Sequence, residues 1–324
     1  MAIGSGRGLS REALPAAAAA AGAGSADPSA AEPLDARAAR GPRTDWAGYV
    51  FVSFFTLPFL AFNVAPVLFG IGIAFTRWGI FGAPHWVGLK NFADAFKDQW
   101  MLQAFRNTAL YGLIIVPGVV VLGLLFALYV HQRWPLSGLA RVLFFSPNVV
   151  SATVIGLVWV WMLDTQFGLI NHYLGLIGIP NIPWITSTGW SLIGVSMASI
   201  WWDLGLAFVL FLAALQDLPK ELNEAAEVDG ASAWQRFRFV ILPQLRPVIS
   251  MVVTLQMIAS LRIFSQVYVM TNGGPAGSST SVIFYIYQTA IYRHLFGYAS
   301  AVSMLLFVMI LVITVLHRRL IREL

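Results

Sequence analysis

Long stretches without charge alternate with short polar segments from Trp46 to the end of the chain. No Lys, Arg, Asp or Glu occurs between Asp45 and Arg77, or between Arg141 and Asp164. A helix needs about 20 apolar residues to cross the hydrocarbon core of a bilayer. Six stretches reach that length, at about residues 49–75, 107–130, 142–163, 190–215, 247–270 and 295–316.

Backbone N–H and C=O groups find no partners in lipid, so stretches of this length are expected to satisfy them within helices. The pattern therefore predicts an all-α integral membrane protein with six transmembrane helices. Residues 216–246 separate the fourth and fifth spans, and we expect them to form the longest cytoplasmic loop. Within residues 78–106, the segment Phe92–Phe96 is expected to form a short helix on the outer surface.

Residues 1–44 differ from the rest of the chain because Ala, Gly, Ser and Pro dominate them, with scattered Arg. They have too few large apolar side chains to build a core, so we expect a disordered cytoplasmic tail. Residues 45–324 then form the transmembrane domain. A cleaved signal peptide is the alternative, but the run Ala16–Ala21 lacks the larger apolar side chains of such a segment.

The composition agrees with lipid as the main solvent, since 58% of residues are hydrophobic and 11% are charged. Soluble domains have about 25% charged residues. The chain has no cysteine, which excludes disulfides and thiolate metal sites. Its net charge of +5 comes from basic residues in short blocks between apolar runs, which are typical of cytoplasmic loops and not of a nucleic-acid-binding surface. Their distribution favours a multi-pass protein with both termini in the cytoplasm.

The loop 216–246 begins with the signals of a short helix. Pro219 suits a first helical turn, and the acidic side chains of Glu221 and Glu224 are favoured near the positive end of a helix. Asp229-Gly230 is expected to end this helix, because glycine adopts the left-handed conformation readily. The first half of the loop is therefore predicted to be a helix of about two turns.

The second half of the loop restarts as a helix. Ser232 followed by Gln235 forms a capping-box pattern, and Pro243 is expected to end this second helix before the fifth span. The small pair Ala225-Ala226 in the first helix permits close approach by a partner. From these signals alone, a solvated connector at the lipid headgroups remains an open alternative.

The order of Glu224-Ala225-Ala226, Asp229-Gly230 and, nine residues later, Val240–Pro243 resembles the EAA loop of binding-protein-dependent ABC importer permeases. In that family the loop forms a coupling helix that lies in a groove of the ATPase subunit. The resemblance implies that the coupling residues of this chain are Glu221, Glu224, Ala225, Ala226, Asp229, Gly230, Ser232 and Pro243.

Further segments are similar to sugar-importer permeases of the maltose type, and together they span about residues 46–320. They are Ser146–Asn148, Leu163–Asn171, Ile200–Gly205, Leu212–Leu215, Tyr268–Pro275 and Gly297–Ala301. Two positions depart from the family pattern. Members often have Asp where this chain has Ser265 and Gly where it has Asn272, which weakens inferences about individual substrate contacts.

The resemblance implies a permease subunit of an ATP-driven importer in a bacterial cell membrane, with a di- or oligosaccharide as substrate. Polyols and glycerol phosphate compounds are the alternative substrates. The expected partners are a second, related permease in a heterodimer, two ATPase subunits that hold ATP and Mg, an extracytoplasmic solute-binding protein and membrane lipid. The chain itself is expected to bind no cofactor, metal or nucleic acid.

Polar groups inside membrane spans are costly, and they usually face a cavity or another helix. Side chains able to hydrogen-bond or stack on a sugar make the candidate substrate path, which comprises Asn148, Trp159, Gln256, Ser260, Phe264, Ser265 and Tyr268. Asp203 and Arg262 are the charged residues within the predicted spans. For both, a structural role such as ion pairing is favoured over substrate contact.

The sequence shows no catalytic motif. Its five histidines do not occur at metal-ligand spacing, and Gly273-Gly274 is not followed by the Lys and Ser or Thr of a phosphate-binding loop. The chain is therefore expected not to be an enzyme. An ion-coupled secondary transporter is the alternative class, but it usually needs several intramembrane ionisable groups or matched halves, and the sequence favours neither.

Overall fold

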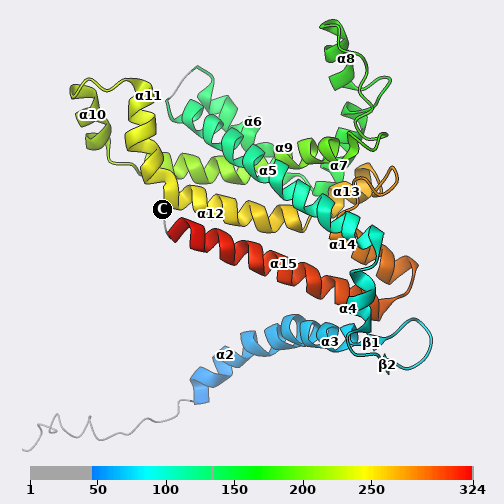
Figure 1. The fold of residues 1–324 in the computed structure, drawn as a ribbon. Helices are drawn as coiled ribbons and strands as arrows, with labels where there is room; N and C mark the ends of the chain where they lie inside the picture. Colours follow the sequence, from blue (N-terminus) through cyan, green and yellow to red (C-terminus); the bar gives the residue numbers. More distant parts are fainter. Residues whose placement is uncertain (1–45, 133–134, 323–324) are drawn as a thin grey trace, which may run out of the picture. The chain divides into compact units, whose positions relative to one another are not determined.

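The computed structural model of the protein describes residues 46–132 and 135–322 (Figure 1). The predicted tail, residues 1–44, lies outside these ranges. The chain divides into two compact units between Phe59 and Leu60, and each is described by itself.

In the first unit the structure describes one helix, α2 (Trp46–Phe59), whose sequence is apolar almost throughout. Its large side chains, Phe51 and Phe54 among them, are exposed. A helix that is apolar on all sides requires an apolar environment, which a bilayer supplies. α2 therefore suits the first predicted membrane span.

Five helical runs among the described residues are long and apolar enough to cross a membrane, and a bent pair of helices brings the number to six. The runs are Gly48–Ala74, Gln99–His131, Ser191–Gln216, Ala233–Leu261 and Phe296–Arg319. In Figure 1 the runs of the second unit contain η2 (Leu60–Val64) with α3 (Ala65–Ala74), α5 (Gln99–His131), α9 (Ser191–Gln216), α12 (Leu242–Leu261) and α15 (Phe296–Arg322). The helical membrane fold predicted from the apolar pattern is confirmed.

The third predicted span, residues 142–163, is not one straight helix. The chain there forms α6 (Ser137–Val149) and α7 (Ala152–Met162), which are bent by 109°. At the break, the indole N–H of Trp202 donates a hydrogen bond to the carbonyl of Val150 at 2.9 Å, the kind of partner that a freed backbone group needs in a membrane. Hydropathy reports the length of an apolar stretch and not its straightness. The prediction of one uninterrupted helix is therefore wrong, although the pair counts as the sixth candidate span.

The core of the second unit lies between α5 and α9, which pack along one another. Tyr111, Phe208 and Phe211 are fully buried there. Gly123 allows the close approach, because a Cβ at this position would lie 3.1 Å from the Cβ of Ala207. Small residues commonly let transmembrane helices approach in this way. α6 and α12 pack against the same pair.

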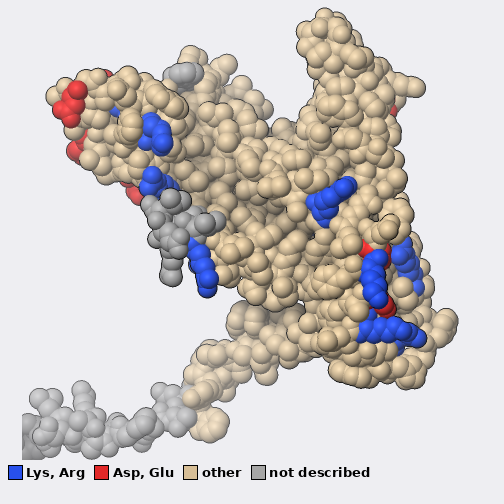
Figure 2. Space-filling view, viewed as in Figure 1, with Lys and Arg blue, Asp and Glu red and all other residues tan. Residues whose placement is uncertain are grey.

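On the face shown in Figure 2, the charged residues of the second unit gather toward two ends, with uncharged surface between them. One end, called the loop end, carries α10 (Lys220–Val228) and α11 (Ala233–Arg236). The other, called the far end, carries α4 (Lys90–Ala95). α4 confirms the short helix predicted within residues 78–106.

The far end holds the remaining short elements. β1 (Thr76–Arg77) pairs antiparallel with β2 (His85–Trp86), a small exception to the all-α prediction. The other elements here are α8 (Leu169–Leu176), α13 (Ser265–Met270), α14 (Val282–Tyr287) and η4 (Gln288–Tyr292). Together they form the links between the long helices at this end.

The segment Asn272–Ser281 is called the buried turn because Gly273 and Ser279–Ser281 are buried, and side chains of α5 hold it at the far end. The amide nitrogen of Asn107 donates to two carbonyl groups of the turn, those of Gly277 at 2.9 Å and Thr280 at 3.1 Å. The hydroxyl of Tyr111 donates to the carbonyl of Ser279 at 2.9 Å. Long-range hydrogen bonds therefore satisfy backbone groups that local structure leaves free.

Candidate functional sites: a helical loop and an intramembrane pocket

The segment between α9 and α12, called the helical loop, forms two short helices as its local signals predict. α10 ends at Val228, and Gly230 has φ +79°. The N–H of Ala231 donates to the carbonyl of Ala226, and the N–H of Gly230 donates to the carbonyl of Glu227, both at 3.0 Å. This pair of bonds is the Schellman arrangement, which requires a left-handed residue that glycine supplies at low cost.

The restart of the chain as α11 also follows the prediction. The N–H of Ser232 donates to the side-chain oxygen of Gln235 at 2.7 Å, and the N–H of Gln235 donates to the hydroxyl of Ser232 at 3.3 Å. Across the break, the guanidinium of Arg236 pairs with the carboxylate of Glu227. The bend between the two short helices is therefore set by bonds within the loop itself.

The surface of the helical loop combines acidic groups with large apolar side chains. Val228, Trp234 and Phe239 are 87%, 69% and 73% exposed. Apolar side chains gathered on an exposed segment indicate an interaction surface. The motif did not single out Trp234 or Phe239, although an aromatic residue in an otherwise polar loop is a signal for one. The predicted coupling residues Glu221, Glu224, Ala225, Asp229, Gly230 and Ser232 are exposed, and Ala226 is half-buried.

Pro243 does not end the second helix, and that prediction is wrong. α11, η3 (Phe237–Ile241) and α12 form one helical run, Ala233–Leu261, with Pro243 in the first turn of α12. A proline removes one hydrogen bond and crowds the carbonyl four residues earlier. The wide π turn just before it changes the bond spacing, and the N–H of Leu242 donates to the carbonyl of Phe237. The helix therefore continues past the proline.

A pocket of about 210 Å³ lies where α5, α9 and the end of α12 meet. α12 stops at Leu261, and α13 begins at Ser265, so the chain between them is irregular. Non-helical backbone at membrane depth is tolerated where it lines a cavity or is buried in protein. Three predicted path residues line this pocket, namely Ser260, Phe264 and Ser265.

Asp203 of α9 and Arg262 at the end of α12 line the same pocket. Neither side chain has an ion-pair or hydrogen-bond partner among the residues that the structure describes. Arg262 follows the last residue of α12 and is exposed, so it does not lie inside a helix as the span prediction had it. A carboxylate within a membrane span is costly to retain, which indicates a functional role for it.

The other four path candidates do not line this pocket. The amide of Asn148 donates to a backbone carbonyl of α9 at 3.4 Å. Trp159 and Gln256 are buried among the helices, with 8% and 3% of their surface exposed. The ring of Tyr268 stacks on Phe264 with centroids 5.6 Å apart. The structure thus brings three candidates together with both charged residues, a combination that the sequence did not predict.

The groups of this pocket suit binding and not bond-breaking chemistry. They are hydroxyls, an amide, one carboxylate and one guanidinium, beside the rings of Trp202 and Phe264. Within residues 46–132 and 135–322, no group of three or more His, Asp or Glu side chains is arranged to hold a metal ion. A bundle of membrane-spanning helices with a polar pocket at broken helices and an exposed helical loop defines a membrane transport protein.

Comparison with known proteins identifies the kind of transporter. The family described as binding-protein-dependent transport system inner membrane component matches residues 119–324. The chain is 33% identical to the probable ABC transporter permease protein YesP of Bacillus subtilis, over 83% of this chain and 88% of that protein. It is 30% identical to the trehalose/maltose transport system permease protein MalF of Thermococcus litoralis, over 83% of this chain and 92% of that protein.

A solved structure shares the fold. It is a bacterial ABC transporter involved in the import of the acidic polysaccharide alginate, at 23% identity with a TM-score of 0.75, covering 86% of this chain and 96% of that one. The chain belongs to the family of binding-protein-dependent transport system inner membrane components. It is a multi-pass inner-membrane permease of an ABC transporter, the translocation component, and ATP hydrolysis belongs to a partner subunit.

Proposed function

We propose that this permease imports a di- or oligosaccharide that an extracytoplasmic binding protein delivers. Two relatives support the substrate class. One is the sulfoquinovosyl glycerol transport system permease protein SmoG of Agrobacterium fabrum, at 31% identity, and the other is the trehalose/maltose permease MalF. A third relative is the probable starch degradation products transport system permease protein AmyD of Thermoanaerobacterium thermosulfurigenes. All three names refer to carbohydrates or their glycosides.

The pocket beside α9 is a suitable part of the sugar path. An ionised Asp203 only accepts hydrogen bonds and Arg262 only donates them, whereas a sugar hydroxyl does both. Ser260 and Ser265 add two hydroxyls, and the ring of Phe264 offers an apolar face for the sugar ring. A ligand rich in hydroxyl groups then supplies the partners that the two charged side chains lack in the described part of the protein. Of the other candidates, Tyr268 supports this part of the path through its stacking on Phe264, whereas Asn148, Trp159 and Gln256 pack among the helices.

The helical loop is the proposed contact with the ATPase, and its exposed apolar surface is the observation that carries this assignment. Val228, Trp234 and Phe239 need a partner surface to leave water, and Glu224 and Ala225 are exposed on the adjacent helix. The resemblance to the EAA loop supports the nucleotide-binding subunit as that partner. Closure of the ATPase on ATP would then move the loop and, through it, α12.

This assignment sets the orientation of the chain. The loop end faces the cytoplasm, as do both termini, and the far end faces the binding protein. Most of the lysines and arginines then lie on the cytoplasmic side, in agreement with the positive-inside rule. One helical loop serves one ATPase subunit, so the importer contains a second, related permease and two ATPase subunits.

The test is the ATPase activity of the reconstituted importer, with and without saccharide-loaded binding protein, in wild type and Gly230→Pro. Proline cannot adopt the φ of +79° found here, so the bend at the end of α10 is lost. We expect stimulation by the loaded binding protein to fall at least about tenfold, which corresponds to about 1.4 kcal/mol, or the ATPase subunit to dissociate. Binding protein without saccharide should stimulate much less.

The matched control is Gly178→Pro. Gly178 follows α8 with φ +80° and the same pair of hydrogen bonds. The N–H of Ile179 donates to the carbonyl of Leu174, and the N–H of Gly178 donates to the carbonyl of Gly175, both at 3.0 Å. The two variants therefore make the same backbone change at opposite ends of the bundle. If Gly178→Pro abolishes stimulation and Gly230→Pro does not, the helical loop is only a connector and the coupling assignment is wrong.

A further inference from the structure

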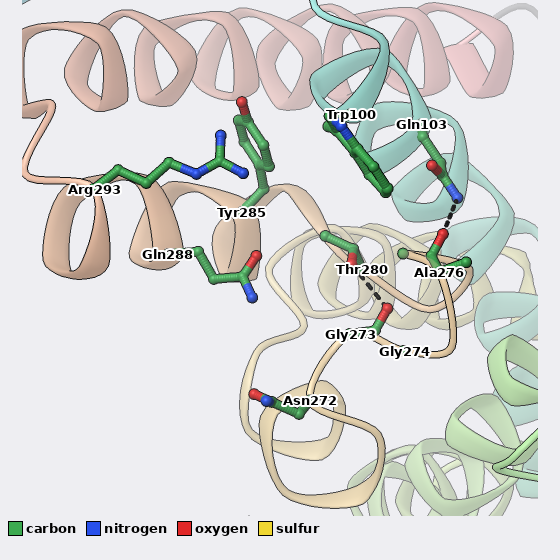
Figure 3. Close-up of a pocket in the computed structure, with 11 residues that line it drawn as sticks. Trp100, Gln103, Asn272, Gly273, Gly274, Ala276, Thr280, Tyr285, Gln288 and Arg293 are labelled. Atoms are coloured by element: carbon green, nitrogen blue, oxygen red, sulfur yellow. Dashed lines mark hydrogen bonds between the residues drawn. The ribbon is translucent and has the colours of Figure 1, made fainter.

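A second recess, at the far end, has no role in the proposed sugar path. It has a volume of about 310 Å³ and lies between the first turns of α5, the buried turn and the segment from α14 to Arg293. Figure 3 shows Trp100 and Gln103 entering it from α5, Gln288 and Arg293 from the opposite wall, and Asn272 at its edge.

The walls of this recess are fixed. The amide of Gln103 donates to the carbonyl of Ala276 at 3.2 Å, which ties α5 to the buried turn. The backbone of Gly277 packs so closely on Trp100 that a Cβ there would lie 2.9 Å from the indole ring. The hydroxyl of Tyr285 donates to the carboxylate that caps α5. A site with fixed walls binds a ligand without a large ordering cost.

Several polar groups of the lining are free to bind a ligand. The side chains of Asn272, Gln288 and Arg293 and the indole N–H of Trp100 have no hydrogen-bond partner in the part of the chain that the structure describes. The guanidinium of Arg293 lies 5.9 Å from the ring centre of Tyr285, a cation–π contact that holds it at the recess. Among the described residues that line the recess, Arg293 carries the charge, and the carboxylate of Asp98, which accepts hydrogen bonds from Tyr285 and Trp100, does not line it.

We propose that this recess is the socket for an acidic side chain of the extracytoplasmic binding protein. The inference rests on the proposed function and orientation, which make the far end the extracytoplasmic face. The carboxylate forms a charge-assisted pair with Arg293 and accepts a hydrogen bond from the amide of Gln288, which lies on the same wall. A protein partner is favoured over a free anionic sugar because the sugar has its own pocket between the broken helices, whereas the binding protein must contact this end.

The experiment measures ATPase stimulation of the reconstituted importer as the concentration of loaded binding protein increases, in wild type, Arg293→Gln and Arg106→Gln. Arg106 is an exposed arginine of α5 outside the recess, so it is the matched control. We expect Arg293→Gln to raise the half-stimulating concentration about tenfold at low salt, with a smaller difference at about 0.5 M salt because screening weakens exposed charge pairs. Arg106→Gln should match wild type.

A charge swap identifies the partner side chain. Acidic residues on the docking face of the binding protein are changed to Lys one at a time and paired with Arg293→Glu, and one pair should recover most of the lost stimulation. The proposal is overturned if Arg293→Gln behaves like Arg106→Gln. It is also overturned if the variant instead weakens binding of a free anionic saccharide in the absence of binding protein. If no binding protein stimulates the wild type, the proposed function itself has failed.

Discussion

Gly230 in the helical loop and Gly273 in the buried turn have nearly the same backbone conformation, with φ +79° and +78°, in opposite surroundings. A Cβ on Gly230 would meet nothing within 4 Å. A Cβ on Gly273 would lie 2.6 Å from both the ring of Phe284 and the hydroxyl oxygen of Thr280. The buried turn is held by the helices around it, whereas the bend of the helical loop is set by its own short-range bonds. A segment whose bend rests on its own short-range bonds leaves its exposed surface available to another protein.

The largest expected effect comes from placing alanine at these two glycines. A left-handed conformation costs an ordinary residue about 1–2 kcal/mol, and overpacking adds about 1–3 kcal/mol. Gly273→Ala bears both costs and should lower the free energy of unfolding by about 3 kcal/mol or more, while Gly230→Ala bears only the first. Thermal unfolding in mild detergent compares the two variants. Equal losses would mean that the buried turn is not tightly packed.

A smaller effect is expected at Asp98, the cap of α5 at the far end. Its carboxylate accepts hydrogen bonds from the hydroxyls of Tyr285 and Tyr298 and from the N–H groups of Trp100 and Met101. Partial burial by itself would raise the pKa of Asp98, but these hydrogen bonds outweigh it and lower the pKa below the ordinary 3.8. The carboxylate therefore stabilises the far end when it is ionised.

Asp98→Asn tests this contribution through its pH dependence. Since the folded-state pKa is lowered, the stabilisation is present above the unfolded pKa of about 3.9 and is lost as the pH falls through the folded pKa. At pH 7 the variant should lose about 1–2 kcal/mol, with solvent exposure reducing the value from that of a buried charged bond. When the free energy of unfolding is measured from pH 7 to pH 3, the value for wild type should approach that of the variant below about pH 4. A constant difference over this range would contradict the assignment.

The smallest effect is expected for Glu227→Gln in the helical loop. Glu227 forms an ion pair with Arg236, which is the ion pair found among the described residues. The side chain of Glu227 is 66% exposed. Such pairs contribute about 0–1 kcal/mol, so the free energy of unfolding of the variant should lie within about 0.5 kcal/mol of that of wild type. A double-mutant cycle with Arg236→Gln measures the pair directly. A coupling energy above about 1.5 kcal/mol would show that the bend depends on this contact more than on the backbone bonds at Gly230.

The same distinction between local and long-range bonds explains what the sequence predicted. The end of α10 at Gly230 and the cap at Ser232 depend on residues within six positions, so their patterns are visible in the sequence. The break at Val150 has local signals, since Pro147 lies in the last turn of α6 and Ser151 caps α7. The indole of Trp202, which bonds to the carbonyl of Val150, lies more than 50 positions away in the sequence, and the apolar run alone did not reveal the bend. The prediction that Pro243 ends a helix was wrong because that rule applies to a regular α-helix, whereas here a π turn precedes the proline.

The two sites differ in the same way. The helical loop is one continuous segment, and its shape followed from its own residues. The pocket joins Asp203 and Arg262, which are far apart in sequence, with Ser260 and Phe264. Their meeting depends on where α12 stops and how α9 packs, which composition and spacing do not report. The sequence therefore identified polar residues inside spans but not which of them share a cavity.

The continuity of α11, η3 and α12 has a mechanical consequence. The run Ala233–Leu261 has 29 residues, which corresponds to a rod of roughly 44 Å at about 1.5 Å per residue. One end of the rod carries the bend at Gly230, and the residue after its other end, Arg262, lines the pocket. If such a rod tilts by about 5° about one end, its other end moves by roughly 4 Å. This distance is comparable to the length of a hydrogen bond to a sugar hydroxyl. In the proposed import cycle, a movement of the helical loop by the ATPase would therefore change the width of the pocket without any change in the residues that line it.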